Sequence, residues 1–126
     1  MSNQLKKKIL VVDDMASMRG VICALLKNLG HTNLDQAEDG SQALNKLRSS
    51  DYDLVISDWN MPKISGIELL KEIRKDEKLK QIPVLLVTAE TKLANIKEAI
   101  ESGVTDFIVK PFTQQSLDTK LSKVWA

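Results

Sequence analysis

The sequence has one cysteine, one histidine and almost no net charge. A single cysteine, Cys23, excludes an internal disulfide and provides no spacing for a metal site. The 126 residues include 18 lysines and arginines against 17 acids, a formal net charge of +1, which is not the electrostatic footprint of a nucleic-acid-binding domain. We therefore expect neither a disulfide scaffold nor a nucleic-acid partner.

Long hydrophobic runs are also missing. The first apolar run, Ile9–Val12, is too short for a membrane span or the core of a signal peptide, and two acids follow it at once. The sequence contains no linker, low-complexity segment or internal repeat. With 43% hydrophobic and 28% charged residues, the chain is expected to form one cytosolic domain, residues 1–126, that makes no contact with a membrane.

Short apolar runs alternate with helical patterns along the chain. Four runs are apolar without alternation, which is typical of parallel strands covered on both faces. These runs are Ile9–Val12, Leu54–Ile56, Val84–Val87 and Phe107–Val109. A further strand near residues 33–37 and a helix near residues 41–47 have weaker patterns.

The predicted helices lie between these runs, where apolar residues recur roughly every three or four positions. Gly30 and Gly103 fall where a left-handed residue ends a helix, and Thr113 is placed as a helix N-cap. Five strand–helix units predict an α/β fold, a doubly wound five-stranded parallel sheet with helices on both faces. Its flavodoxin-like form has the strand order 2-1-3-4-5, which we expect here.

In such sheets, ligands bind beyond the carboxyl ends of the strands. The polar residues predicted at these ends are Asp13, Asp14, Asp58, Thr88 and Lys110. Any one of them alone is better explained as a helix cap or a solvated strand end. Together they are harder to explain in that way, because two carboxylates about 4 Å apart repel by roughly 4 kcal/mol at an effective dielectric constant of about 20.

A cluster of three acids should therefore hold a proton or bind a hard divalent cation. Mg²⁺ fits best, because the ligands are oxygens and the only histidine, His31, follows a helix. A carboxylate beside Mg²⁺ can accept a phosphoryl group, with Asp58 as nucleophile, Lys110 neutralising charge and Thr88 donating a hydrogen bond. Since the sequence has no Walker loop and no GxGxxG, the phosphoryl group must come from another molecule.

These residues and their spacing resemble a response-regulator receiver domain, and more closely the free-standing chemotaxis regulators of the CheY type. The resemblance covers about residues 8–125. It is carried by Asp13-Asp14, Asp58-Trp-Asn-Met-Pro62, Thr88-Ala-Glu90 and Val109-Lys-Pro-Phe-Thr113. It implies a single receiver domain that signals by binding a partner and catalyses only its own phosphorylation and dephosphorylation.

The resemblance also implies the details of the site. Mg²⁺ is held by the side chains of Asp14 and Asp58, by the backbone carbonyl of Asn60 and, through water, by Asp13. A histidine kinase is the implied phosphodonor in a two-component system, and the role is chemotaxis through flagellar rotation. A flagellar motor switch protein and a phosphatase are further candidate partners, Asn60 and Glu90 stand where the dephosphorylation rate is tuned, and a monomer is expected.

Thr88 and Phe107 are the implied switch residues. In the family, the hydroxyl moves inward on phosphorylation and the aromatic ring follows it, and the bond before Pro111 is cis. Regulators of this type usually have tyrosine at the position of Phe107. Because phenylalanine lacks the polar tip that favours a wet position, we hypothesise that Phe107 lies inward more often than tyrosine would, even without phosphorylation. The position of the ring would then be a poorer switch. The alternative is that Phe107 is only a buried strand residue.

Three other functions remain open at this point. An aspartate-nucleophile phosphatase typically needs a second acid two residues after the nucleophile, where this chain has Asn60. A flavodoxin-like carrier would need a phosphate-cradling loop after the first strand, where this chain has two acids. The third is a receiver that drains phosphoryl groups from a shared kinase or acts on a partner other than the motor, which Phe107 keeps open.

Overall fold

The computed structural model describes residues 6–89 and 93–125, in which strands and helices alternate as the sequence predicts. The strands are β1 (Ile9–Val12), β2 (Leu34–Ala37), β3 (Leu54–Asp58), β4 (Val84–Thr88) and β5 (Asp106–Val109). The helices are α2 (Ala16–Asn28), α3 (Gly40–Ser49), α4 (Gly66–Lys75), α5 (Leu93–Glu101) and α6 (Gln114–Trp125).

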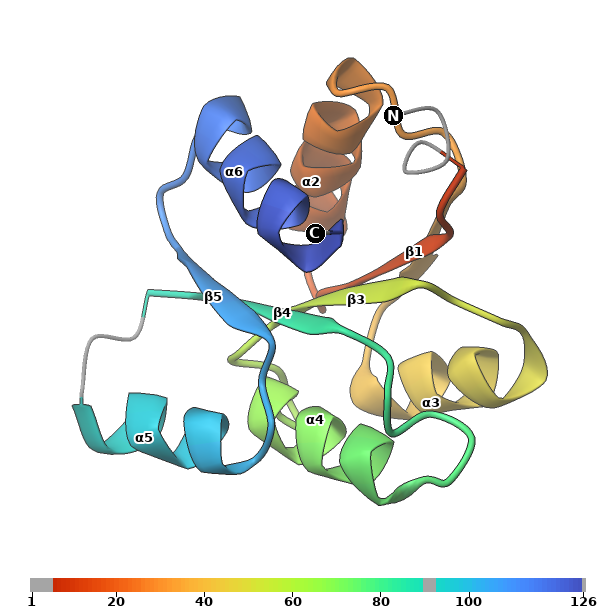
Figure 1. Cartoon of the computed structure of the whole chain (residues 1–126), viewed down its shortest axis with the longest axis vertical. Helices are drawn as coiled ribbons and strands as arrows, with labels where there is room; N and C mark the ends of the chain where they lie inside the picture. The colour runs from red at the N-terminus through yellow and green to blue at the C-terminus, as the bar shows by residue number, and fades with distance from the viewer. Residues whose placement is uncertain (1–5, 90–92, 126) are drawn as a thin grey trace.

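The strands form one parallel sheet with the order β2-β1-β3-β4-β5, which confirms the predicted fold class and strand order. Figure 1 shows the two layers of helices, with α2 and α6 on one face of the sheet and α3, α4 and α5 on the other. The weakly indicated strand and helix, β2 and α3, are both present.

Each face of the sheet has its own hydrophobic core. Alternate residues of β1 supply the two cores: Leu10 and Val12 pack on the α3 and α4 side, and Ile9 and Val11 on the α2 and α6 side. Every residue of β1, β3 and β4 is buried. Since these central strands are covered on both faces, their side chains can reach a ligand only at the strand ends.

The outermost strand β5 departs from the prediction that all the apolar runs are covered on both faces. Val109 is 52% exposed, and Ile100 on the neighbouring helix α5 is 60% exposed. The prediction is wrong for β5, because at the edge of the sheet the helices leave part of the strand open to solvent. Two strands are also longer than the apolar runs that predict them, since β3 includes Asp58 and β4 includes Thr88.

The predicted helix boundaries agree with the structure. Gly30 and Gly103 have φ values of 99° and 93°, the left-handed conformation that favours glycine. The Thr113 hydroxyl oxygen accepts a hydrogen bond from the Ser116 amide at 3.1 Å, as an N-cap does. The Lys110–Pro111 peptide bond is cis.

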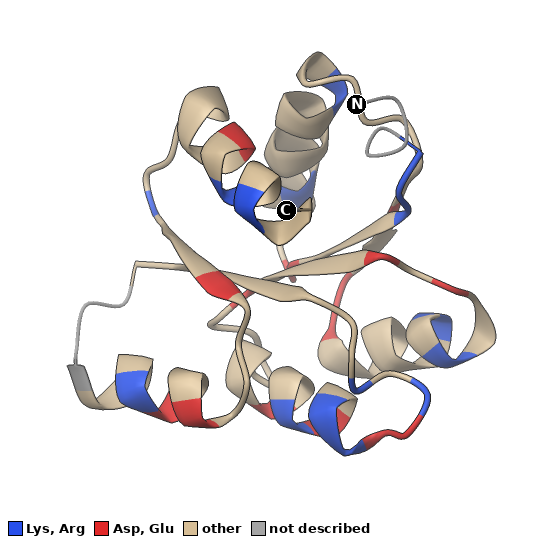
Figure 2. Cartoon of the chain, in the orientation of Figure 1, with Lys and Arg blue, Asp and Glu red and all other residues tan. Residues whose placement is uncertain are grey.

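Basic and acidic residues are mixed along α4 and α5 (Figure 2). Mixed charges of this kind are typical of a solvated face. Within residues 6–89 and 93–125, no helix is long and apolar enough to cross a membrane.

Arg74 at the end of α4 ties three chain segments together. Its guanidinium group donates to the carbonyl oxygens of Gly103 at 2.9 Å, Ile82 at 2.6 Å and Lys80 at 3.2 Å. One side chain therefore connects α4 to the segments that lead into β4 and β5. The planar, fork-shaped guanidinium suits it to several carbonyls at once.

We predict that Arg74→Ala lowers the free energy of unfolding by about 2–3 kcal/mol, because charged hydrogen bonds are lost and the carbonyl groups lose their donor. Arg48→Ala is the matched control: Arg48 forms an exposed ion pair with Asp76 at 3.1 Å, and its loss should cost less than about 1 kcal/mol. Urea unfolding measures both. Equal losses would contradict the assignment of Arg74 as a structural clamp.

Candidate functional site

The register of the sheet brings the predicted strand-end residues together. Val12 pairs with Ser57, so the next residues, Asp13 and Asp58, lie level with each other at the ends of β1 and β3. On the other side of β3, its hydrogen bonds to β4 continue one residue past the strand, where the Trp59 amide donates to the Val87 carbonyl oxygen at 3.0 Å. The carboxyl ends of the central strands therefore share one rim.

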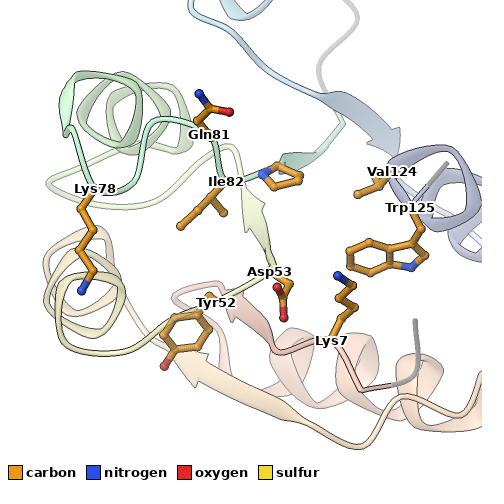
Figure 3. Close-up of a pocket in the computed structure, with 9 residues that line it drawn as sticks. Lys7, Tyr52, Asp53, Lys78, Gln81, Ile82, Val124 and Trp125 are labelled. Atoms are coloured by element: carbon orange, nitrogen blue, oxygen red, sulfur yellow. The ribbon is translucent and has the colours of Figure 1, made fainter. Parts of the chain in front are cut away.

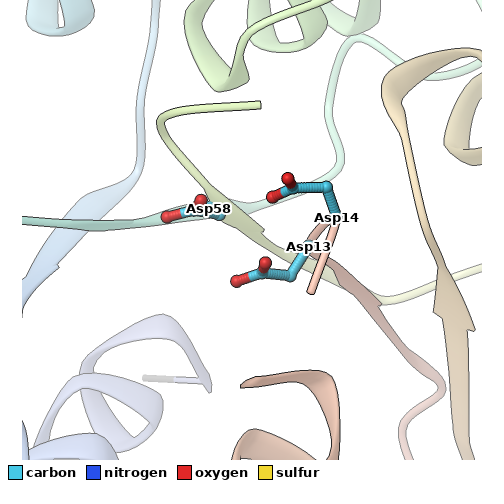
Figure 4. A group of neighbouring side chains, drawn as sticks. All are labelled: Asp13, Asp14 and Asp58. Atoms are coloured by element: carbon cyan, nitrogen blue, oxygen red, sulfur yellow. The ribbon is translucent and has the colours of Figure 1, made fainter. Parts of the chain in front are cut away.

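Three acids converge on this rim. Asp13, Asp14 and Asp58 each offer a carboxylate oxygen, and these oxygens all lie within 4.8 Å of one another. Figure 4 shows the side chains coming from the ends of β1 and β3. Asp13 and Asp58 are only 1% and 6% exposed, whereas Asp14 is exposed. The cluster therefore has two buried members and one that solvent can reach.

Lys110 joins the cluster from the end of β5. Its backbone amide donates to Thr88 at 2.8 Å, and its ammonium group donates to Oδ1 of Asp58 at 3.0 Å. The Asp58 side chain is 8% exposed and that of Lys110 29%, so this ion pair is largely shielded from solvent. Thr88, at the end of β4, is buried next to these residues in the sheet. The structure thus brings together all five strand-end residues that the sequence singles out.

Asp13 shows why the cluster fits a cation. Its Oδ1 accepts a hydrogen bond from the Met15 amide at 2.9 Å, but its Oδ2 is buried without a hydrogen-bond partner among the described residues. Burial raises the pKa of the Asp13 carboxyl group, opposed by the Met15 hydrogen bond, and the negative charge of Asp58 raises it further. A buried carboxylate oxygen without a donor is suited to binding a hard cation such as Mg²⁺.

The aromatic residues beside the acids form a stack. The rings of Trp59 and Phe107 have centroids 5.9 Å apart and planes 17° apart. Trp59 is 7% exposed, so it covers the core next to Asp58 and does not stand out as a surface recognition residue. Phe107 is half-buried and packs against the same core. The residue after the proposed acceptor is therefore in direct contact with the edge strand.

The structure does not test the predicted roles of two further residues. Asn60 lies on the exposed surface two residues after Asp58, and its carbonyl as a metal ligand stays a prediction. Glu90 lies outside the described residues.

Several residues that hold the site in place were not found from the sequence. Arg19 donates to the Asp13 carbonyl at 2.7 Å, and the buried Ser57 hydroxyl donates to the Asp58 carbonyl at 2.9 Å. The Gly66 amide donates to Trp59 at 2.8 Å, and a Cβ at Gly66 would lie 2.5 Å from the Asp58 carbonyl oxygen. Only glycine can sit this close to the backbone of the site.

One of these features does have a sequence signal. Ser65 and Glu68 have the S-x-x-E spacing of a capping box, and the structure contains both of its hydrogen bonds. This spacing locates the start of α4 and hence the end of the loop that follows Asp58. The contacts of Arg19 and Gly66 depend on segments meeting in space, which no local pattern reports.

A pocket lies at the opposite end of the sheet. It has a volume of about 570 Å³, and its lining includes Lys7, Tyr52, Asp53 and Trp125 (Figure 3). Asp53 directly precedes β3, so the pocket is at the amino end of the strand, away from the acids. Ligands of doubly wound sheets bind at the carboxyl ends. The acid cluster, although it is not this pocket, is therefore the candidate functional site.

Comparison with known proteins supports the same assignment. Over 118 residues, the chain is 51% identical to the chemotaxis protein CheY-3 of Vibrio cholerae serotype O1, which covers 94% of this chain and 91% of that protein. It is 50% identical to the chemotaxis protein CheY of Pseudomonas aeruginosa, covering 94% and 95% of the two chains.

Solved structures have the same fold. The chemotaxis protein CheY4 of Vibrio cholerae superposes with a TM-score of 0.88 at 35% identity, covering 94% of this chain and 98% of that one. The receiver domain of a sensor histidine kinase from Pseudomonas aeruginosa, solved with magnesium in its active-site cleft, has a TM-score of 0.85 at 27% identity and covers 96% and 99%. The family model of the response regulator receiver domain matches residues 9–122. The chain therefore belongs to the response regulator receiver domain family, whose members are signalling proteins.

Proposed function

We propose that the chain is a single receiver domain, residues 1–126, that switches a two-component pathway when a histidine kinase phosphorylates Asp58. The observation that carries this proposal is the ion pair between Lys110 and Asp58, set beside two further carboxylates at the carboxyl end of β3. The pair places the Lys110 ammonium group against Oδ1 of Asp58 in a shielded position, where it can stabilise negative charge during a transfer to the carboxylate.

The transfer step uses one carboxylate oxygen of Asp58. This oxygen attacks the phosphorus of a phosphohistidine, the P–N bond breaks, and its electron pair stays on the imidazole nitrogen of the donor. The product is an acyl phosphate on Asp58, which water later hydrolyses to the carboxylate and inorganic phosphate. Lys110 stabilises the charge on the phosphoryl oxygens, and the Thr88 hydroxyl donates a hydrogen bond to one of them.

Asp13, Asp14 and Asp58 are the side chains that would hold Mg²⁺, with the Asn60 carbonyl as a further ligand. The bound ion would neutralise the phosphoryl oxygens and reduce the repulsion between an anionic donor and the acids. The orphaned Oδ2 of Asp13 supports this assignment.

The output proposed for the chain is chemotaxis. Two relatives at 50% and 51% identity are named chemotaxis proteins, and both are covered over nearly their whole length. We assign a cytoplasmic monomer that controls flagellar rotation by binding a motor switch protein and is reset by its own dephosphorylation and a phosphatase. A phosphate sink for a shared kinase is the second candidate. The ring stack of Phe107 on Trp59 supports it, because a ring that stays stacked in both states would respond less to phosphorylation.

The first prediction that follows from the proposed function concerns Asp58. In a Trp125→Phe background, which leaves Trp59 as the single tryptophan, beryllofluoride should change tryptophan fluorescence only when Mg²⁺ is present. Asp58→Asn should abolish this change, because an amide cannot form the acyl phosphate or its mimic. Asp51→Asn, a substitution of an exposed acid outside the cluster, is the control and should respond like the parent. A full response from Asp58→Asn would rule out Asp58 as the acceptor.

The second prediction is a pH dependence that follows from the raised pKa of Asp13. A carboxyl group with a raised pKa binds more protons in the folded state than in the unfolded state, so it makes the fold less stable as the pH rises above about 4, the ordinary pKa of aspartate. Metal-free Asp13→Asn should therefore be more stable than the wild type at neutral pH, and the difference should shrink as the pH falls.

Mg²⁺ should reverse this order, because the wild type gains binding energy that Asp13→Asn largely loses. Urea unfolding at acid and neutral pH, with and without Mg²⁺, measures both effects. A metal-free Asp13→Asn protein that is less stable than the wild type at neutral pH would show that the Asp13 charge does not destabilise the folded state.

The third prediction concerns the switch. We infer that the Phe107 ring stays on Trp59 with and without a phosphoryl mimic, whereas the hydroxyl of Phe107→Tyr should favour the outward position until beryllofluoride is added. Nuclear Overhauser contacts between the two rings report the position directly. Phe112→Tyr, at the only other phenylalanine, is the control and should leave these contacts unchanged. Full outward-to-inward exchange of Phe107 itself would refute the inference.

A further inference from the structure

Gly40, the first residue of α3, lies against the loop that follows Asp58. A Cβ at Gly40 would lie 2.7 Å from Cγ2 and 2.8 Å from Cβ of Ile64. Both distances are shorter than carbon atoms tolerate, and the Cβ of Ile64 is fixed to its backbone. A side chain at Gly40 could therefore be accommodated only if the Ile64 backbone or the start of α3 moved.

The start of α3 is firmly held. The Asp39 carboxylate accepts a hydrogen bond from the Gln42 amide at 2.7 Å, and the Gln42 side chain accepts one from the Glu38 amide at 2.8 Å. The Asp39 cap and the Gln42 side chain together hold the first turn of the helix against the residues that precede it. The first turn of α3 therefore resists displacement, so the clash would fall on the loop that contains Ile64.

That loop, Trp59–Ser65, is named the acceptor loop here, and it is closed at its base. The Gly66 amide donates to the Trp59 carbonyl at 2.8 Å, and the capping box of Ser65 with Glu68 fixes the following turn of α4. Within the loop, Lys63 has a φ of 67°, and the Ile64 amide donates to Pro62 at 2.8 Å. A tight loop with both ends held has little freedom to absorb a shift at Ile64 without moving its other residues, Asn60 included.

We propose that Gly40 is a positioning residue for the phosphoacceptor site, because its missing side chain lets Ile64 seat against α3 and so fixes the acceptor loop around Asp58 and Asn60. This inference rests on the proposed function, in which the loop supplies the Asn60 carbonyl as a ligand for Mg²⁺. Gly40 touches neither the metal nor the phosphoryl group and acts through Ile64. None of the strand-end residues of the site is on α3, so the helix would contribute to the site only in this way.

The test compares Gly40→Ala with Gly20→Ala in the Trp125→Phe background. Gly20 is an exposed residue within α2 at which a Cβ meets nothing within 4 Å, so it is the matched control. Three measurements are made: backbone amide shifts of residues 59–66 without metal, Mg²⁺ affinity from Trp59 fluorescence, and the urea midpoint. Gly40→Ala should shift the loop amides and weaken Mg²⁺ binding by about 10-fold, the lower end of the range for losing a group that orients metal ligands.

Gly20→Ala should leave the loop amides and the Mg²⁺ affinity unchanged. A merely structural role for Gly40 would lower the urea midpoint but leave the affinity of the folded protein unaltered, and that result would overturn the proposal. If the parent protein itself does not bind Mg²⁺, the proposed function fails. The metal-free amide shifts then decide whether Gly40 positions the loop, and unshifted amides would overturn the inference.

A double-mutant cycle keeps the test decisive if Gly40→Ala does not fold. Ile64→Gly removes both atoms that a new methyl group would meet. Adding Gly40→Ala to Ile64→Gly should therefore change the Mg²⁺ affinity by less than about 2-fold, because coupled residues are not additive. A further loss close to 10-fold in the double variant would show that the alanine acts through some contact other than Ile64, and the proposal would be wrong.

Discussion

The structure depends on holding like charges together at the ends of two neighbouring strands. Asp13 and Asp58 are both buried, and the pairing of Val12 with Ser57 sets them side by side. The carboxylates cannot separate unless the parallel ladder shifts, and a shift would expose strands whose residues are buried throughout. The hydrophobic core thus bears the electrostatic cost of the site, and a proton on Asp13, the ammonium of Lys110 or a bound cation relieves it.

The same parallel pairing of strands also places an ammonium group and a hydroxyl group beside the acids. Lys110 follows β5 and reaches Asp58 from an edge strand, while Thr88 ends the strand between them. Asp13 and Asp14 follow β1, and Asp58, Thr88 and Lys110 lie at or just after the ends of β3, β4 and β5. The sheet itself therefore brings the acids, an ammonium group and a hydroxyl together. The groups suited to phosphoryl transfer thus meet on the rim of the sheet and not in the pocket beside Tyr52 and Trp125 at the other end.

The sequence predicts the parts of this structure that local patterns encode. Uninterrupted apolar runs predict β1, β3 and β4, glycines mark the ends of two helices, and the residues that end those runs meet in one cluster. The exposure of Val109 was not predictable in this way, because apolar residues at an edge look like those in the middle of a sheet. The contacts of Gly40 with Ile64 and of Trp59 with Phe107 were not predictable either. They join segments far apart in sequence, and their distances follow only from the assembled layers.

These non-local contacts are also the ones through which the site can act on its surroundings. Trp59 is bonded to Asp58 and stacks on Phe107, and Phe107 shares β5 with the exposed Val109. A change at the acid therefore has a short physical route to the surface. A route carries a signal only if one of its contacts has two arrangements that the acceptor's charge can bias. In this chain the proposed contact is the ring stack of Trp59 and Phe107, where phenylalanine lacks the hydroxyl that would favour an outward, wet position. Under the proposed function, the acceptor site can therefore be complete while the strength of its output depends on the position of this ring.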